Sequence, residues 1–245
     1  MSDKLVCLTD AASISAVLQS RANPRQAEHH LRFFKTGPGE YGEGDKFLGL
    51  TVPQVRAVSK LGAGIALDEV RCLLDSPWHE VRLCALQILV LQFRRADEKQ
   101  REHIVSLYLQ RAERINNWDL VDLSVNILGE WYSGRDRTKL YELARSSSLW
   151  ERRMAMVATH VFIKRGDIAD ALRIAEILLS DAHDLTHKAV GWMLREVGKQ
   201  DMSALKRFLA EHYRRLPRTT LRYAIEKFPE DERRAWLKKP LQHME

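Results

Sequence analysis

Residues 115–122, Ile-Asn-Asn-Trp-Asp-Leu-Val-Asp, carry the signals that decide the fold. An asparagine just before a helix accepts hydrogen bonds from the free backbone N–H groups of the first turn, and an acidic residue there suits the helix dipole. We therefore expect a helix to begin near Trp118. Its apolar face follows at helical spacing and consists of Leu120, Val121, Ser124, Val125, Ile127, Leu128 and Trp131.

Trp118 and Asp122 lie one helical turn apart on this predicted helix. At about 100° per residue, Asp122 projects roughly opposite the apolar face, and Trp118 projects close to Asp122. A large indole and a carboxylate on the same outward side indicate a functional surface. The alternative is that Trp118 packs against a neighbouring element and that Asp122 is a solvated surface acid.

The same kind of helix opening recurs along the chain, each time before an apolar helical run. The openings begin at Trp78, Trp118, Trp150, Leu185 and Leu216, roughly 30 to 40 residues apart, which is the period of paired-helix repeats. Strand signals are scarce. We predict an all-α fold, a curved α-solenoid of degenerate HEAT-like repeats with a concave basic groove, formed as one domain over residues 1–245.

Glycine and proline interrupt the helical pattern once, between Thr36 and Lys46, where four glycines and one proline occur. We expect an ordered loop there, anchored by Tyr41, Phe47, Leu48 and Leu50. No GK[ST] ending follows, so a nucleotide-binding P-loop is not indicated. The expected helices are 10–21, 24–35, 53–61, 66–75, 77–95, 97–113, 117–132, 136–146, 149–165, 167–180, 184–199, 201–214, 217–228 and 230–237.

Composition narrows the class of protein. The 245 residues are 45% hydrophobic, enough for a sizeable core, and the net charge of +6 favours a polyanionic partner. Cys7, Cys72 and Cys84 lack CxxC spacing, which argues against a zinc site or a disulfide framework and fits a reduced cytosol. No window has the length of apolar sequence that a membrane span needs, and the chain start lacks the apolar core of a signal peptide.

Cations and aromatic rings share the outward faces of the later helices. One stripe holds Arg153, His160 and Lys164, and the next helix carries Lys188, Trp192, Arg195 and Lys199, followed by Arg218 and Arg222. Basic residues near helix C-termini also suit the dipole in a purely solvated face, and we interpret Arg94, Arg95 and Arg165 in this way. Tryptophans between cations indicate instead a groove that binds nucleic acid.

Other chemistry has weaker support. His183 and His187 are one turn apart, but they lack the HExxH pattern and a third ligand, so we expect no metal. Serine and cysteine nucleophiles lack recognisable motifs. Among the carboxylates, Asp122 is the candidate for chemistry.

Several spaced motifs resemble the AlkD-type DNA alkylation repair glycosylases. They are Asn117-Trp-Asp-Leu-Val-Asp122, Trp150-Glu-Arg-Arg153, Gly191-Trp-Met-Leu-Arg-Glu196, Gly37–Asp45 with Phe47-Leu-Gly49 and Val52-Pro-Gln-Val-Arg56, and Thr220–Lys227. The resemblance spans nearly the whole chain and implies a HEAT-like solenoid that holds duplex DNA. It further implies excision of N3- and N7-alkylated purines without metal or organic cofactor, in the manner of base excision repair, and without the need to flip the base.

By motif matching, the resemblance assigns Asp122 as the catalytic carboxylate, Trp118 and Trp192 as groove tryptophans, and Arg153 as the arginine of that site. The DNA-binding candidates are Lys188, Arg195, Lys199, His160, Lys164, Arg218 and Arg222. The expected partner is alkylated double-stranded DNA, bound by a monomer in the bacterial cytoplasm at the nucleoid. No deep aromatic pocket is evident in the sequence, and no lysine stands out for lyase chemistry.

Two other classes of protein fit the same pattern. A non-catalytic HEAT-like scaffold could grip nucleic acid or an acidic protein, but a carboxylate such as Asp122 in a phosphate-binding groove weakens binding by repulsion. A protein–protein adaptor would use the two tryptophans as interface hot spots and would show no salt-dependent DNA affinity.

Overall fold

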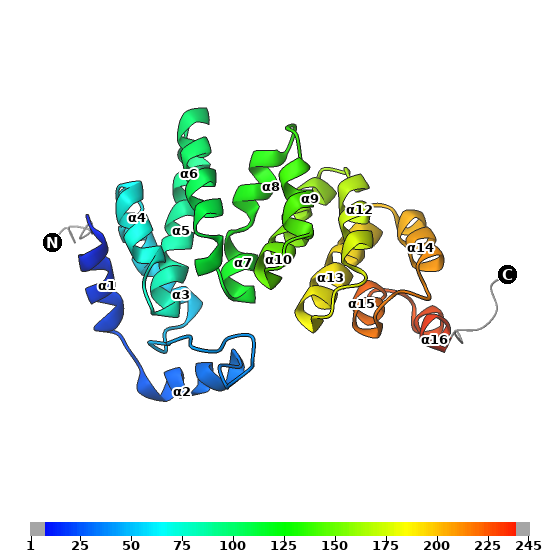
Figure 1. Cartoon of the computed structure of the whole chain (residues 1–245), viewed down its shortest axis with the longest axis horizontal. Helices are drawn as coiled ribbons and strands as arrows, with labels where there is room; N and C mark the ends of the chain where they lie inside the picture. The colour runs from blue at the N-terminus through cyan, green and yellow to red at the C-terminus, as the bar shows by residue number, and fades with distance from the viewer. Residues whose placement is uncertain (1–7, 239–245) are drawn as a thin grey trace. The chain divides into compact units, whose positions relative to one another are not determined.

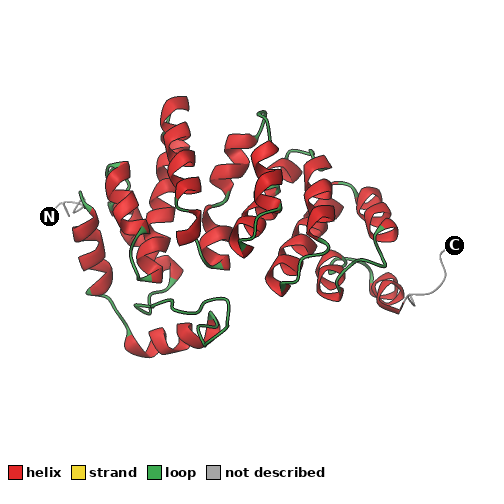
Figure 2. Cartoon of the chain, viewed as in Figure 1, coloured by secondary structure: helices red, strands yellow, loops and turns green. Residues whose placement is uncertain are grey.

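The computed structural model describes residues 8–238, and these form helices joined by loops, with no β-strand (Figures 1 and 2). One isolated bridge pairs Lys46 with Trp78. The all-α fold class predicted from the sequence is therefore confirmed. Cys72 and Cys84 are free thiols, and Cys7 lies outside the described residues.

The chain divides into two compact units, Met1–Ile127 and Leu128–Glu245, here called unit 1 and unit 2. The boundary falls within helix α8 (Asn126–Tyr132). Unit 1 contains α1 (Ala11–Gln19), α2 (Pro24–Phe33), α3 (Val52–Leu61), α4 (Leu67–Leu74), α5 (His79–Arg95), α6 (Glu98–Gln110), the 3-10 turn η1 (Ala112–Arg114) and α7 (Trp118–Ser124). Unit 2 contains α9 (Thr138–Ala144), α10 (Leu149–Ala158), α11 (His160–Lys164), α12 (Ala169–Leu178), α13 (Asp184–Gln200), α14 (Met202–Glu211), α15 (Arg218–Ala224) and α16 (Glu230–Lys238).

Helix α5 is the centre of unit 1. All of its residues from His79 to Leu89 are buried, because α3, α4 and α7 pack around it. A helix that is buried on all sides needs apolar residues all round, and the run from Val81 to Leu89 is mostly apolar. The polar residues His79, Glu80 and Arg82 interrupt this pattern at its N-terminus, and all three are buried.

The glycine-rich loop and α2 lie at one end of unit 1, across the ends of α3, α5 and α7 that are lowest in Figure 1. Of the expected anchors, Phe47, Leu48 and Leu50 are buried and Tyr41 is half-buried, so the predicted anchoring of the loop is confirmed at three of the four residues. Gly49 has φ +81°, and a Cβ there would lie 2.2 Å from the carbonyl oxygen of Asn23. Only glycine fits this close approach of the loop to the start of α2.

Helix α13 has the same central place in unit 2, where α10, α12, α14 and α15 pack on it. Its apolar side consists of Ala189, Val190, Met193, Leu194 and Val197, all buried. Gly191 allows α15 to come close, since a Cβ at that position would lie 2.5 Å from Cβ of Tyr223 and 2.6 Å from the carbonyl oxygen of Thr220. The residue next to this contact is Trp192.

Two predicted long helices are interrupted in the structure, so both predictions of a continuous helix were wrong. Each break lies at or next to a serine or threonine. The helix expected over 117–132 divides at Val125, and the helix expected over 149–165 divides at Thr159. The Ser124 hydroxyl donates to the carbonyl oxygen of Leu120 at 2.6 Å, and that of Thr159 donates to Met156 at 2.7 Å. Such side-chain bonds compete with the helical backbone ladder and bend it.

Within residues 8–238, no helix combines the length and the apolar character needed to cross a bilayer.

Candidate active site

Helix α7 begins where the sequence predicts. Asn117 is its N-cap, and the Oδ1 atom of this buried asparagine accepts a hydrogen bond from the backbone N–H of Trp118 at 2.8 Å. Trp118 and Asp122 are both half-buried, whereas Leu120, Val121 and Ser124 are buried in the core of unit 1. The predicted separation of α7 into an inner apolar face and an outer face with Trp118 and Asp122 is confirmed.

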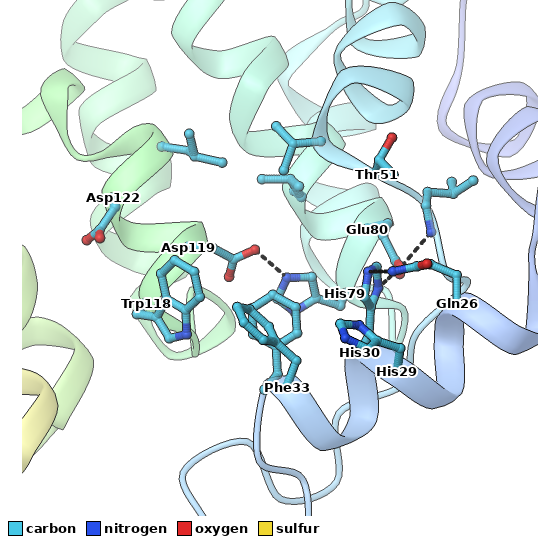
Figure 3. Close-up of a pocket in the computed structure, with 15 residues that line it drawn as sticks. Gln26, His29, His30, Phe33, Thr51, His79, Glu80, Trp118, Asp119 and Asp122 are labelled. Atoms are coloured by element: carbon cyan, nitrogen blue, oxygen red, sulfur yellow. Dashed lines mark hydrogen bonds and ion pairs between the residues drawn. The ribbon is translucent and has the colours of Figure 1, made fainter.

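Trp118 and Asp122 line a hollow of about 440 Å³ that lies wholly within unit 1 (Figure 3). Its wall is mostly apolar and comes from α2, the start of α3, the first turns of α5, and α7. We call it the aromatic hollow. Its aromatic and imidazole side chains are His29, His30, Phe33, Phe34, His79 and Trp118.

The rings of the aromatic hollow touch one another across elements that are distant in sequence. Trp118 contacts Phe33 edge-on at 5.9 Å between ring centroids and stacks on Phe34 at 5.5 Å. Phe33 remains 54% exposed, so a large apolar ring stands at the mouth of the hollow beside the indole (Figure 3). Trp118 therefore has a packing partner, as the alternative interpretation required, and it also lines an open aromatic hollow.

No deep aromatic pocket was evident in the sequence, and the structure shows an aromatic hollow that is open to solvent. The rings that join Trp118 come from the end of α2, and nothing in the helical spacing of residues 24–35 indicates that this end meets α7. The contact depends on the loop over residues 35–51, which returns the chain to α5. A signal was present in the pair Phe33-Phe34, since the structure buries Phe34 and exposes Phe33.

A buried charge network fixes α7 to the floor of the aromatic hollow. The ring of His79 places Nδ1 2.9 Å from Asp45 Oδ2 and Nε2 2.9 Å from Asp119 Oδ2. Arg82 donates to the other oxygen of Asp45 at 2.6 Å and to Asn116 Oδ1 at 3.0 Å. The two carboxylates are thus balanced by two cations, as buried charges require.

Both ring nitrogens of His79 face carboxylate oxygens, so both must carry a proton to donate. Burial alone would lower the pKa of His79, but Asp119 and then Asp45 raise it from 6.5 to about 9. Burial would raise the pKa of Asp45, yet hydrogen bonds and charge from His79 and Arg82 hold it below its usual value. His79 is therefore a charged imidazolium at neutral pH, and it binds Asp119, the residue that follows Trp118.

The raised pKa of His79 predicts that the protein loses stability as pH rises. A histidine that titrates near 6.5 when unfolded and near 9 when folded contributes its full stabilisation below pH 6.5, and this contribution declines as pH rises through 9. We expect the melting temperature of the wild type to fall between pH 6.5 and 9. In His79→Gln, which cannot become charged, thermal melting over this range should show a flatter profile; an equally steep profile would contradict the assignment.

Glu80, which also lines the aromatic hollow, binds the loop between α2 and α3. Its buried carboxylate accepts from the backbone N–H groups of Leu48, Gly49 and Leu50 at 2.8, 2.8 and 3.1 Å. His30 of α2 lies 3.4 Å from the same carboxylate and 3.0 Å from the amide of Gln26. Both α2 and the loop are therefore held against α5.

The remaining predicted catalytic residues lie in unit 2. Arg153 of α10 is buried and donates through Nη1 to the carbonyl oxygen of Leu185 at 2.7 Å, which ties α10 to the first turn of α13. Trp192 is half-buried on α13 and contacts the ring of His160 at 5.9 Å. The structure thus brings Trp118 and Asp122 together in unit 1, and Trp192 and His160 together in unit 2.

Most of the predicted DNA-binding cations of unit 2 have acidic or backbone partners. Lys188 pairs with Asp184 at 2.8 Å, Lys199 pairs with Glu196 at 2.7 Å, and Arg195 pairs with Glu226. Arg218 donates to the carbonyl oxygen of Leu237 at 2.9 Å, whereas Lys164 and Arg222 are exposed. Burial and then Lys164 lower the pKa of His160, which makes this residue a neutral neighbour of Trp192 rather than a cation.

The histidines considered for metal binding have structural roles instead. His183 caps α13 and accepts from the backbone N–H of Leu185 at 3.1 Å, and His187 Nε2 lies 2.6 Å from the carbonyl oxygen of Asp181. In the part of the chain from 8 to 238, no group of three or more histidine, cysteine, aspartate or glutamate side chains is arranged to hold a metal ion.

Comparisons with known proteins agree with this helical architecture. A predicted DNA alkylation repair enzyme from Enterococcus faecalis has a similar structure, with a TM-score of 0.68 and 17% identity over 85% of this chain and 97% of that chain. AlkD2 from Streptococcus mutans matches with a TM-score of 0.53 and 17% identity over 90% of this chain and 100% of that chain. No curated protein matches the sequence. The family model described as DNA alkylation repair enzyme matches residues 14–228, which include α7 and α13 with their tryptophans, and the chain therefore belongs to the family of DNA alkylation repair enzymes.

Proposed function

We propose that the protein is a monofunctional DNA glycosylase that hydrolyses the N-glycosidic bond of positively charged N3- and N7-alkylated purines in duplex DNA. The observation that carries the proposal is the position of Asp122 at the edge of the aromatic hollow, one turn from Trp118. We further propose that it acts as a monomer on nucleoid DNA in the bacterial cytoplasm, where base excision repair would take up its product.

The chemistry of the substrate explains why so few groups are needed. A purine alkylated at N3 or N7 carries a positive charge, and it leaves as a neutral base when the electron pair of the C1′–N bond moves to the ring. The sugar then resembles an oxocarbenium ion, which a fixed carboxylate stabilises electrostatically. Water adds to C1′ and releases a proton. In this proposal Asp122 stabilises the positive sugar and positions the water.

The aromatic side chains suit the cationic base. An indole or phenyl face attracts a cation by about 0.5 to 2 kcal/mol. The ring of Trp118 stacks on Phe34, so it is oriented before DNA binds, and the cap of Asn117 fixes the backbone at the start of its helix. Phe33 offers a second, exposed ring at the mouth of the hollow. Neither group requires the base to be fully extruded from the duplex.

The roles of Trp192 and Arg153 stay predictions that rest on the motif resemblance. We propose that Trp192 packs on the substrate nucleotide and that Arg153 holds a phosphate, with Lys188, Arg195, Lys199, His160, Lys164, Arg218 and Arg222 as further DNA contacts. The ion pairs of Lys188, Arg195 and Lys199 must open or be shared for these residues to bind phosphate directly.

The decisive test is release of free 7-methylguanine from a methylated DNA duplex by the wild-type protein, measured by chromatography of the released base. We expect release with stoichiometric formation of abasic sites and no strand cleavage. Binding to the duplex without release would instead identify a non-catalytic DNA-binding helical repeat protein. Strand cleavage that accompanies release would contradict the monofunctional assignment.

Lesion charge provides a separate prediction. We expect 3-methyladenine and 7-methylguanine to be released and uracil to be retained, because the mechanism provides no general acid for a neutral leaving base. The measurement compares single-turnover release from duplexes that differ only in the lesion. Release of uracil at a rate similar to that of 7-methylguanine would contradict the proposed mechanism.

A further inference from the structure

A second hollow also borders Asp122, and it too lies wholly within unit 1. It has a volume of about 330 Å³ and is formed by α3, α5, the end of α7 and the first residue of α8. Asp122 and Leu123 line both hollows. The aromatic hollow is mostly apolar, whereas this second hollow has the basic side chains Arg56, Lys60 and Arg94 in its wall, and we call it the basic hollow.

The basic hollow brings three exposed cations with no acidic partner in the described chain to one place in unit 1. Arg56, Lys60 and Arg94 are exposed, and none of them forms an ion pair within residues 8–238. By contrast, the predicted DNA-binding residues Lys188, Lys199 and Arg195 all have acidic partners. Three cations around one hollow repel one another, and an anion placed between them would remove this repulsion.

A buried amide provides independent support for a ligand. Gln87 of α5 is only 8% exposed and lines the basic hollow. Its Oε1 atom accepts from the hydroxyl of the buried Ser59 at 3.1 Å, which fixes the amide orientation. Its Nε2 atom is buried and has no hydrogen-bond partner in the described chain. Buried donors nearly always have a partner, so this one indicates a missing acceptor.

We propose that the basic hollow binds a phosphodiester group of the DNA backbone. A phosphate oxygen is negatively charged and only accepts hydrogen bonds, which matches the three cations and the Gln87 donor. The assignment to the phosphate next to the reacting nucleotide rests on the proposed function, because it assumes that the sugar lies at Asp122. The backbone would then occupy the basic hollow and the base the aromatic hollow, with Asp122 lining both. Arg94, which the sequence pattern assigns to a solvated helix end, becomes a DNA contact.

Two adjacent arginines of α5 make a matched test. Arg94 lines the basic hollow, whereas Arg95 is also exposed but lines a different hollow with Gln92 and His103. Arg94→Gln and Arg95→Gln remove the same charge from the same helix. We would measure the affinity of each variant for an unmodified DNA duplex by fluorescence anisotropy over a series of KCl concentrations, after thermal melting has shown equal stability.

We expect Arg94→Gln to weaken DNA binding and to reduce the slope of log Kd against log [KCl] by about 0.9, the change for one lost phosphate contact. Arg95→Gln should leave the slope unchanged. A third variant, Gln87→Leu, removes the donor without a change of charge, so the affinity should fall while the slope stays the same. Equal slopes for the two arginine variants would overturn the proposal.

Two further results distinguish this inference from a site for free phosphate and from the proposed glycosylase function. If inorganic phosphate binds the wild type but not Arg94→Gln, while this substitution changes neither the DNA affinity nor the salt slope, the hollow is a site for free phosphate and the DNA assignment is overturned. Because the duplex is unmodified, no excision is needed. Failure of the glycosylase assay would therefore leave the salt-slope result standing, and the reverse also holds.

Discussion

Asp122→Asn is expected to lower the rate of 7-methylguanine release by about 10²- to 10³-fold, the usual loss when one electrostatic contact to the transition state is removed. Asparagine has nearly the same shape as aspartate, so the packing of α7 should be kept. The amide carries no negative charge, and it can neither stabilise a positive sugar nor attract a proton from water. The measurement is single-turnover release at saturating protein.

The same substitution should leave duplex affinity unchanged or improve it. Asp122 borders the basic hollow, and a carboxylate next to a phosphate site repels the backbone. A slower reaction with equal or tighter binding is the signature of a group that acts on the transition state and not on ground-state binding. The comparison must therefore report the rate and the dissociation constant separately.

Glu102→Gln is a suitable control for this experiment. Glu102 is an exposed acid on α6 of the same unit, outside both hollows that border Asp122. Its neutralisation changes the net charge by the same amount and should change neither rate nor binding. If both variants release the base at the wild-type rate, Asp122 has no chemical role. If both lose the same small factor, the effect is one of net charge.

The sequence predicted the helices and the outer face of α7 because these depend on local rules. Helical spacing separates Leu120 and Val121 from Asp122, and Asn117 marks the helix start. The sequence did not indicate the breaks at Val125 and Thr159, because the helical spacing of apolar residues continues across both. In the structure both residues keep helical dihedral angles, and the hydroxyl hydrogen bonds of Ser124 and Thr159 show where the backbone hydrogen bonding is interrupted.

The surroundings of Asp122 were less predictable, because they come from distant segments. Phe33 reaches Trp118 only through the fold of the loop between α2 and α3, and loops of this kind have no periodicity. The basic hollow was missed for a different reason. Basic residues near a helix C-terminus usually suit the dipole, and only the spatial arrangement distinguishes Arg94 from Arg95.

One available signal at the site was the group His79, Glu80 and Arg82 at the start of an otherwise apolar helix. Charged residues are rarely buried without partners, so their presence in a core helix predicts buried acids and acceptors elsewhere. Asp45, Asp119 and the backbone of residues 48–50 are those partners. The sequence alone could not pair them, since each lies 30 or more residues away from its partner.

His79→Leu should produce the largest loss of stability, about 3 to 5 kcal/mol, the usual cost when one partner of a buried ion pair is removed. Leucine has a similar volume but donates no hydrogen bonds. Asp45 would keep Arg82, whereas Asp119 would lose the donor at 2.9 Å and keep only the backbone N–H of Leu120 at its other oxygen. We expect the melting temperature to fall by about 10 °C, measured by thermal unfolding at pH 7.

His103→Leu is the matched control, because the same chemical change then occurs at an exposed position of α6 and should alter stability by less than about 0.5 kcal/mol. His79→Gln should be intermediate, since its amide can donate to one carboxylate but not to both. The deficit of His79→Leu should shrink at acid pH, because protonation of a carboxylate removes the unpaired charge. A loss of stability in His79→Leu that is independent of pH would show that His79 contributes packing and not charge. The helix that carries Trp118 would then not be stabilised by a charged His79.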